Sequence, residues 1–295
     1  MRVGMIGLGE IAQRAYLPVL ATRRDIELAL CTRNADILEE LAEAYRVERR
    51  YSDPAALLAD TPDAVFVHAA TGAHPELVAQ VLEAGIPVYV DKPMAQNLDD
   101  ARRLVELARE KNCSLYVGFN RRFAPAYRAV TEEEYSYVIM QKHRIGFPDE
   151  PRRVVFDDFI HVIDTLRFLL DDAVLTDIRA VRVTGELALV AITVVASGRS
   201  GIGLMNRDGG SSEEVLDVHG PGLRRTIRDL VEVVEDRDGR RTVHRLDEWT
   251  PVAVRRGFAA MCDFFLDAVR VGYRLDAGDA LATHEMCEKV VQAVT

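Results

Sequence analysis

The feature that most constrains this chain is a glycine turn at its start. A short apolar run, "RVGMIG", leads directly into the turn, and a helical run follows. Strand-like and helical segments then alternate through the first 120 residues, and the strands are apolar throughout. Such strands are typical of a parallel sheet that helices cover on both faces. We therefore expect residues 1–120 to form an α/β domain with a parallel sheet.

The pattern changes after about residue 128, where longer strand-like runs are separated by Gly, Asp and Ser turns. The segment "DRDGR" is typical of a hairpin turn. One clear helix, "FDDFIHVIDTLRFLL", interrupts the strands, and two more helical runs end the chain. We expect residues 121–295 to form an α+β domain on a mixed, mostly antiparallel open sheet, which binds substrate and carries the oligomer contacts.

Composition narrows the class of protein. The net charge of −10 argues against nucleic acid or an anionic membrane as a partner, because both attract basic surfaces. The four cysteines have no pair at metal-ligand spacing, and no apolar run is long enough to cross a bilayer. The sequence opens on a strand and not on a signal peptide. We expect a cytoplasmic protein without a metal.

The glycine turn itself predicts a cofactor. Gly7-Leu8-Gly9-Glu10-Ile11-Ala12 is a GxGxxA fingerprint, placed between a strand and a helix as dinucleotide-binding Rossmann domains require. Gly7 allows the tight turn, Gly9 lets the backbone approach a pyrophosphate, and Ala12 permits close helix packing. The helix N-terminus then faces the phosphates with unpaired N–H groups. The alternative is a glycine turn without a ligand.

The choice between NAD and NADP depends on the end of the second strand. Asp25 and Glu27 lie at the start of that strand, and Glu27 is five residues before Thr32, roughly 16 Å away. The residues expected to reach the adenosine ribose are Thr32, Arg33 and Asn34. A hydroxyl with a guanidinium suits a 2′-phosphate, so NADP is favoured over NAD. Alternatively, Arg33 is a solvated surface charge.

Four motifs in order resemble one family. The fingerprint, "VDKP" after the fifth strand, "VGFNRRFAPAY" after the sixth and "DDFIHVID" in the second domain resemble the glucose–fructose oxidoreductase, inositol dehydrogenase and rhizopine-catabolism (Gfo/Idh/MocA) family. The resemblance covers nearly the whole chain. Within the family, "AYLPVL", "VFVHAAT" and "VDKPMAQNL" are most similar to the branch called MviM.

The resemblance implies that Lys92 is the catalytic lysine of the family's [DE]KP motif. It would lie beside the nicotinamide and bond the reacting oxygen, and a cation at the carboxyl end of a central strand can stabilise a developing alkoxide. Asp91 would support that charge, and Pro93 would set the turn, often through a cis bond. The alternative is a strand-ending turn with an exposed lysine.

The segment "DDFIHVID" supplies the second implied group. Asp157, His161 and Asp164 share one face of a helix. By resemblance, His161 is the general acid/base, and Asp157 binds substrate or orients the imidazole. Asp158 has no assigned role, and Asp164 is expected to be structural. The alternative is a surface helix with an ordinary salt-bridging histidine.

The segment "VGFNRRFAPAY" is expected at the hinge. Asn120 should lie near the nicotinamide, and Arg122 and Tyr127 should line the substrate pocket. Arg121 is expected to be only a surface charge. Lys142 and His143 are further substrate candidates on a sheet strand, with a purely structural role as the alternative.

Residues after the fourth strand resemble those beside the nicotinamide ribose. They are Ala70, Thr71 and His74, although His74 precedes a proline and could simply begin a helix. The remaining histidines, His68, His219, His244 and His284, have no companion motif, so we expect them to be structural.

Together these features predict an NAD(P)-dependent oxidoreductase. Hydride would pass between nicotinamide and a secondary alcohol or carbonyl of a sugar, cyclitol or related small metabolite. One alternative is an eliminase or glycosidase that uses tightly held NAD, and another is a non-catalytic NAD(P)-binding sensor. The open sheet of the second domain predicts a homodimer or homotetramer that pairs through it.

Overall fold

The computed structural model describes all residues, 1–295, and no helix is both long and apolar enough to span a membrane. The chain forms two compact units, Met1–Gly118 with Phe258–Ala282 and Phe119–Gly257 with Thr283–Thr295. Residues 258–282 were expected in the second domain. These residues belong to the first unit because Phe265 packs edge-on against Phe66 and Tyr89 of its sheet.

The first unit is built on six parallel strands in the order β3-β2-β1-β4-β5-β6. This order is that of a Rossmann sheet, in which the strand order reverses between β1 and β4 while all strands stay parallel. The strands are β1 (Arg2–Ile6), β2 (Glu27–Cys31), β3 (Arg49–Tyr51), β4 (Ala64–Val67), β5 (Val88–Asp91) and β6 (Leu115–Gly118). The predicted parallel sheet is confirmed.

The helices of this unit begin at side chains that cap them. Asn34, Asp53 and Asn97 each accept a backbone N–H three residues on, which satisfies a donor that the first turn leaves unpaired. The helical segments are η1 (Ala12–Tyr16), α1 (Leu17–Leu20), α2 (Ala35–Tyr45), α3 (Pro54–Ala59), η2 (Thr71–Ala73), α4 (His74–Glu83), α5 (Leu98–Glu110) and α10 (Phe258–Arg270).

The second unit contains an eight-stranded sheet in the order β14-β13-β12-β11-β7-β10-β9-β8. Only β7 and β10 pair in parallel, so the sheet is mixed and mostly antiparallel, as predicted. The strands are β7 (Tyr137–Lys142), β8 (Val174–Val183), β9 (Glu186–Ala196), β10 (Arg199–Asn206), β11 (Glu214–Gly220), β12 (Leu223–Arg228), β13 (Glu232–Arg237) and β14 (Arg240–Arg245). The predicted hairpin joins β13 to β14 through Asp238 and Gly239, which both have positive φ.

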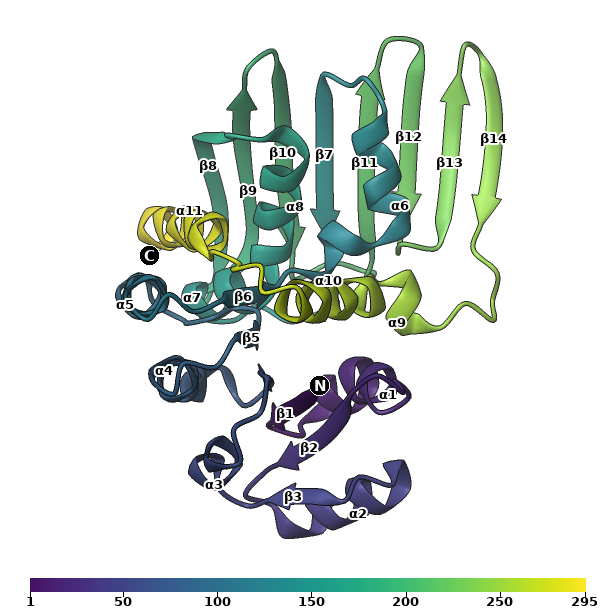
Figure 1. The fold of residues 1–295 in the computed structure, drawn as a ribbon. Helices are drawn as coiled ribbons and strands as arrows, with labels where there is room; N and C mark the ends of the chain where they lie inside the picture. Colours follow the sequence, from purple (N-terminus) through teal and green to yellow (C-terminus); the bar gives the residue numbers. More distant parts are fainter. The chain divides into compact units, whose positions relative to one another are not determined.

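One helix of this unit, α8 (Ile160–Leu170), packs along the sheet over β7, β9 and β10 (Figure 1). It approaches closely because β10 carries Gly201 and Gly203, where a Cβ atom would lie 2.8 Å from Leu170 and Val162 respectively. The other helical segments are η3 (Asn120–Phe123), α6 (Pro125–Arg128), η4 (Ala129–Glu132), α7 (Pro151–Arg153), η5 (Val154–Phe159) and α9 (Val252–Arg255). The last helix, α11 (Gly278–Val294), contributes residues to both units.

Candidate active site

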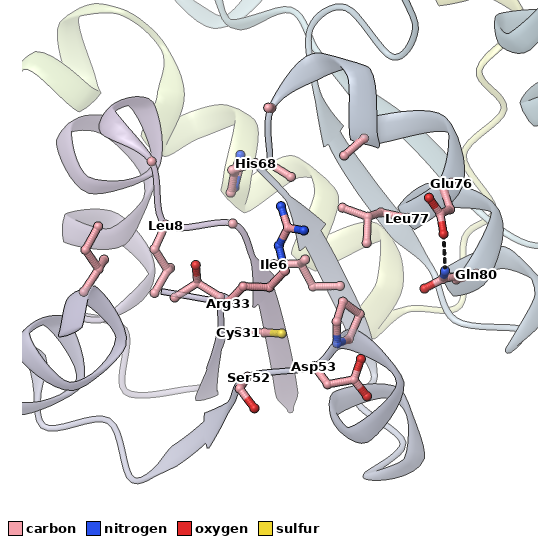
Figure 2. A pocket seen from close by; sticks show the side chains of 18 residues that line it. Ile6, Leu8, Cys31, Arg33, Ser52, Asp53, His68, Glu76, Leu77 and Gln80 are labelled. Carbon is pink, nitrogen blue, oxygen red and sulfur yellow. Dashed lines mark hydrogen bonds between the residues drawn. The ribbon is translucent and has the colours of Figure 1, made fainter. Parts of the chain in front are cut away.

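A cavity of about 510 Å³ opens at the carboxyl ends of β1, β2 and β4 (Figure 2). It lies where the strand order reverses, which is where open parallel sheets bind dinucleotides. Of the predicted cofactor residues, six line it: Gly7, Leu8, Gly9, Thr32, Arg33 and Ala70. Gly7 is required here, because its φ is +91° and a Cβ atom would lie 2.4 Å from the Ala69 nitrogen. Gly9 has open space around it.

The other fingerprint residues lie outside this lining. Ala12 is fully buried under the turn, consistent with close helix packing. Glu10 pairs with Arg14 on the surface, at 3.0 Å, and Ile11 is 40% exposed. These three residues belong to the start of the helix that follows the glycine turn, and they do not line the cavity.

His68 is a cavity residue for which the sequence analysis expected a structural role. It follows β4 directly, is 3% exposed, and stacks on Tyr16 with ring centroids 3.9 Å apart. Neither ring nitrogen has a hydrogen-bond partner in the chain. Burial, and then repulsion from His74, lowers the pKa of His68 to about 3, so the ring is neutral. His68 thus borders the cavity while both of its ring nitrogens are buried and unpartnered, and a buried polar atom without a partner calls for an explanation such as a bound ligand.

The end of the cavity next to β2 and β3, where the ribose was expected, is lined by Thr32, Arg33, Ser52 and Asp53. Figure 2 labels the last three of these residues. Asn34, predicted to bind the ribose, instead caps α2, and its side chain accepts from the Ile37 nitrogen at 3.1 Å. As expected, Glu27 is remote from this end, because it stands at the first position of β2 and pairs with Arg49.

The turn after β5 is held by a network of buried polar groups. Asp91 accepts from the Tyr16 hydroxyl at 3.1 Å and from the Lys92 nitrogen at 2.9 Å, and the Lys92–Pro93 peptide is cis. Burial raises the pKa of Asp91, against the opposing charge of Lys92. His74 bridges the Pro93 and Ala69 carbonyl oxygens at 2.8 and 2.9 Å. The loop after β4, which lines the cavity, is thereby fixed to the loop after β5.

This network assigns His74 a positioning role. Its ring nitrogens are occupied by backbone carbonyls, and its side chain is 2% exposed. Thr71 begins the short η2 turn just before it, and neither residue lines the cavity.

In the second unit, Arg121 is buried and contacts three polar side chains, so the expectation that it is a surface charge is wrong. It is 4% exposed, and its guanidinium forks onto Glu214 at 2.8 and 2.5 Å. The same side chain donates to Asn120 Oδ1 at 3.2 Å and to His161 Nδ1 at 2.8 Å. The η3 turn directs it inward, where Glu214 at the start of β11 compensates its charge.

The contact between Arg121 and His161 fixes the imidazole tautomer. A guanidinium can only donate hydrogen bonds, so Nδ1 must be the acceptor. The ring proton therefore lies on Nε2. Protonating Nδ1 as well would place two donors and two positive charges face to face, so the neutral Nε2–H form fits this contact.

Arg122 and Tyr127, predicted to line the substrate pocket, make internal contacts instead. Tyr127 is fully buried, and its hydroxyl donates to Glu214 at 3.0 Å. Arg122 forks onto Asp164 at 2.9 and 2.6 Å, and Thr283 donates to the same carboxylate at 3.1 Å. Asp164 thus holds Arg122 to the interior. Asn120 donates to the Arg256 carbonyl at 2.7 Å.

A second cavity, of about 560 Å³, lies beside the helix that carries His161. Asp157 and Asp158 line it from η5, together with Arg144, Arg207 and Ser212. Lys142 lies behind it, bound to Asp158 at 2.6 Å. Burial, and then repulsion from Arg121, lowers the pKa of Lys142 to about 7. Asp158, Glu214 and Arg207 were not assigned roles from the sequence.

Comparison with known proteins identifies the family. The model for the "Oxidoreductase family, NAD-binding Rossmann fold" (GFO_IDH_MocA) matches residues 1–119, and "YceM-like, C-terminal domain" matches 125–238. The chain is 34% identical to YceM of Salmonella typhimurium over 278 residues, which is 92% of this chain and 90% of the relative. The chain belongs to the Gfo/Idh/MocA oxidoreductase family.

Two further relatives place the chain within this family. The crystal structure of a dehydrogenase (MviM) from Clostridium difficile has a TM-score of 0.94 at 27% identity and covers 99% of both chains. A myo-inositol 2-dehydrogenase from Thermotoga maritima is 30% identical over 187 residues, 59% of this chain and 56% of the relative. The family resemblance, including that to the MviM branch, is confirmed, and the first unit is an NAD(P)-binding Rossmann domain.

Proposed function

We propose that this oxidoreductase is a dehydrogenase that interconverts a secondary alcohol and a carbonyl on a sugar, cyclitol or related polyol. The observation that carries this proposal is the buried Arg121–His161 contact, which places the imidazole proton on Nε2, on a helix beside a polar cavity. The inositol dehydrogenase among the relatives supports the substrate class.

In this proposal the residues divide the chemistry of one hydride transfer. The nicotinamide cofactor, when bound, exchanges hydride with the substrate carbon. In the direction of alcohol oxidation, Lys92 would take the hydroxyl proton as a neutral amine; in the direction of carbonyl reduction, it would stabilise the alkoxide and give the proton back as an ammonium group. His161 donates a hydrogen bond from Nε2 to the substrate oxygen and stays neutral. The earlier expectation gave His161 the proton transfer; the direction of the Arg121 bond favours a donor role instead.

Two substitutions at one position test this division. His161→Gln keeps an N–H donor but cannot exchange a proton at neutral pH, so we expect kcat within about tenfold of the wild type. His161→Ala removes the donor and should cost more. If His161→Gln instead lowers kcat by about 10²- to 10⁴-fold, the usual effect of losing a general acid or base, His161 transfers the proton.

Turnover itself is tested by absorbance at the nicotinamide band with sugars and cyclitols. Lys92→Met should lower kcat by about 10²- to 10⁴-fold while cofactor affinity is retained. Cofactor binding without turnover of any polyol would favour a sensor. A nicotinamide cofactor that co-purifies and shows no net reduction while product forms would favour elimination.

We further propose NADP as the preferred cofactor. Arg33 and Thr32 supply a cation and a hydroxyl at the ribose end of the cavity, and Asp53 on the same rim is occupied in capping α3, where it accepts from Ala56 at 3.2 Å. Fluorescence titration should give tighter binding of NADPH than of NADH, and Arg33→Ala should weaken NADPH alone. Equal or tighter NADH binding would overturn the preference.

A final proposal concerns assembly as a homodimer or homotetramer. At one edge of the open sheet, β8 and β9 expose apolar side chains to solvent: Val174, Val181 and Val183 on β8 and Val195 on β9. An apolar sheet face of this kind is suited to a second copy of the chain. Sedimentation of the wild type should give a dimer or tetramer, and Val181→Asp should dissociate it. A monomeric wild type would contradict the proposal.

A further inference from the structure

The walls of the second cavity carry three arginines and three aspartates, and Lys142 behind the wall adds one positive charge. Asp158 is contacted by three cations: Lys142 Nζ at 2.6 Å, Arg144 Nε at 2.8 Å and Arg207 Nη1 at 3.0 Å. Next to them, Arg121 is paired with Glu214. These four cations and two carboxylates leave an excess of two positive charges. Asp157 on the cavity wall removes one of them, and Asp149 is already paired with Arg153.

Lys142 is buried, and a buried positive charge that nearby carboxylates do not fully balance is costly. Arginine cannot lose its proton, so only Lys142 can relieve the excess. Its pKa, lowered to about 7 by burial and by Arg121, against the attraction of Asp158 and Glu214, reflects that situation. Alternatively, a bound anion that is not part of the chain can balance the excess positive charge.

The geometry of Arg144 suits such an anion. Its Nε and Nη2 donate to Asp158 at 2.8 and 3.0 Å, while Nη1 has no partner in the chain, and the side chain is 43% exposed. Arg207 is fixed beside it, since its Nε donates to the Phe147 carbonyl at 2.6 Å. Ser212 adds a hydroxyl to the same wall. The volume of about 560 Å³ is in the range of small-ligand sites.

The cavity is also close to the proposed chemistry. Asp157 and Asp158 stand four and three residues before His161 on one continuous helical run, which corresponds to a rise of about 4–6 Å. A six-carbon sugar derivative is long enough to place one end in the cavity while a hydroxyl-bearing carbon lies near the His161 ring.

We propose that the substrate of this dehydrogenase carries an oxyanion, a carboxylate or a phosphate ester, which Arg144 and Arg207 bind in the second cavity. This inference rests on the proposed function in one respect, namely that the bound molecule is the substrate. The excess of cations and the cavity stand independently of it.

The anion site is tested first without any sugar. Inorganic phosphate and acetate are titrated against the full-length protein at constant ionic strength, with chloride as the reference salt, and the melting temperature is measured. Phosphate, acetate or both should raise the melting temperature, since a ligand that binds the folded state stabilises it. Arg144→Ala should abolish the rise. Arg179→Ala, which removes an exposed arginine on β8, should retain it. The absence of any rise above chloride would overturn the proposal.

The substrate class is tested next with matched sugars. Glucose, glucuronate and glucose 6-phosphate, with the corresponding galactose and mannose series, are compared by calorimetry in the presence of NADP or NAD. An anionic member should bind at least tenfold more tightly than its neutral parent, and Arg144→Ala should remove about 10- to 100-fold of that affinity. Whichever of the two anionic sugars binds more tightly shows whether the site recognises a carboxylate or a phosphate.

The two proposals fail in distinguishable ways. Equal binding of neutral and anionic sugars, with turnover of the neutral ones, would overturn the anionic substrate and leave the dehydrogenase intact. Anion-dependent binding that Arg144→Ala abolishes, with no reduction of NADP or NAD, would support the oxyanion site and contradict the dehydrogenase.

Discussion

Replacing Glu214 by glutamine is the sharpest test of how the second unit is held together. Glu214 accepts both arms of Arg121 and the Tyr127 hydroxyl, and all three side chains are buried. Glu214→Gln removes the charge and keeps the shape, which leaves the Arg121 guanidinium buried without its counter-charge. Breaking one side of a buried ion pair costs about 3–5 kcal/mol.

The pH dependence of the unfolding free energy gives a second value for how much the Glu214 charge stabilises the fold. Burial raises the pKa of Glu214, but the charge and hydrogen bonds of Arg121 outweigh it and lower the pKa from the ordinary 4.5 to about 2. A depressed carboxyl pKa stabilises the fold above its unfolded value and loses that contribution as the pH falls through the folded value. The shift corresponds to about 3 kcal/mol at pH 7, of which about 2 kcal/mol is lost by pH 3.

The assay is urea unfolding followed by circular dichroism from pH 7 to pH 3. At pH 7 the variant should unfold with about 3 kcal/mol less free energy than the wild type, and the difference should narrow as the pH approaches 3. The matched control is Glu232→Gln, which breaks the pair with the largely exposed Arg245 and should cost under about 1 kcal/mol. A wild-type-to-variant difference that is small at pH 7, or constant down to pH 3, would refute the reasoning.

Three further outcomes follow from the two cavities. His68→Ala should weaken NADPH and NADH binding by about five- to fiftyfold, because a hydrogen bond from a buried donor is lost, and fluorescence titration measures it; unchanged affinity would mean that His68 does not contact the cofactor. Gly7→Ala should lower the melting temperature and abolish cofactor binding, since its Cβ atom would overlap the Ala69 backbone; normal binding would contradict the cavity assignment. At pH 8, Lys142 is mostly neutral because its pKa is about 7, and oxyanion binding should make it take up a proton. The reason is that a bound anion favours the charged amine in a cluster that already contains Arg121, Arg144, Arg207, Asp158 and Glu214. Calorimetry in buffers of different ionisation enthalpy detects that uptake, and buffer-independent heats would exclude it.

The sequence was sufficient to predict the two sheets, because periodicity and turn residues are local signals. The apolar strands and the GxGxxA turn specify the parallel sheet, and "DRDGR" specifies the last hairpin. The family motifs also placed Lys92 after β5 and His161 on a helix.

The buried ion pairs were beyond the sequence for a physical reason. Arg121 and Arg122 are adjacent and chemically identical, and only the tertiary fold brings Glu214, 93 residues away, to the first and Asp164 to the second. The role of His68 was missed because it lies at the end of β4 with no charged neighbour in sequence. Its position after a central parallel strand was the signal that could have indicated the cavity.

The composition of the first unit has a consequence for synthesis. Its helix α10 supplies Phe265 and Met261 against Phe66 and Tyr89, and the Leu275 carbonyl accepts from the Leu115 nitrogen at the end of the sheet. These residues emerge from the ribosome about 140 residues after the last strand of that sheet. At 5–20 residues per second the delay is roughly 7–30 s, during which the nascent Rossmann sheet exposes aromatic side chains that α10 later covers. The first unit can therefore be completed only after most of the second unit has been made, and a fragment that stops at residue 120 should aggregate rather than fold.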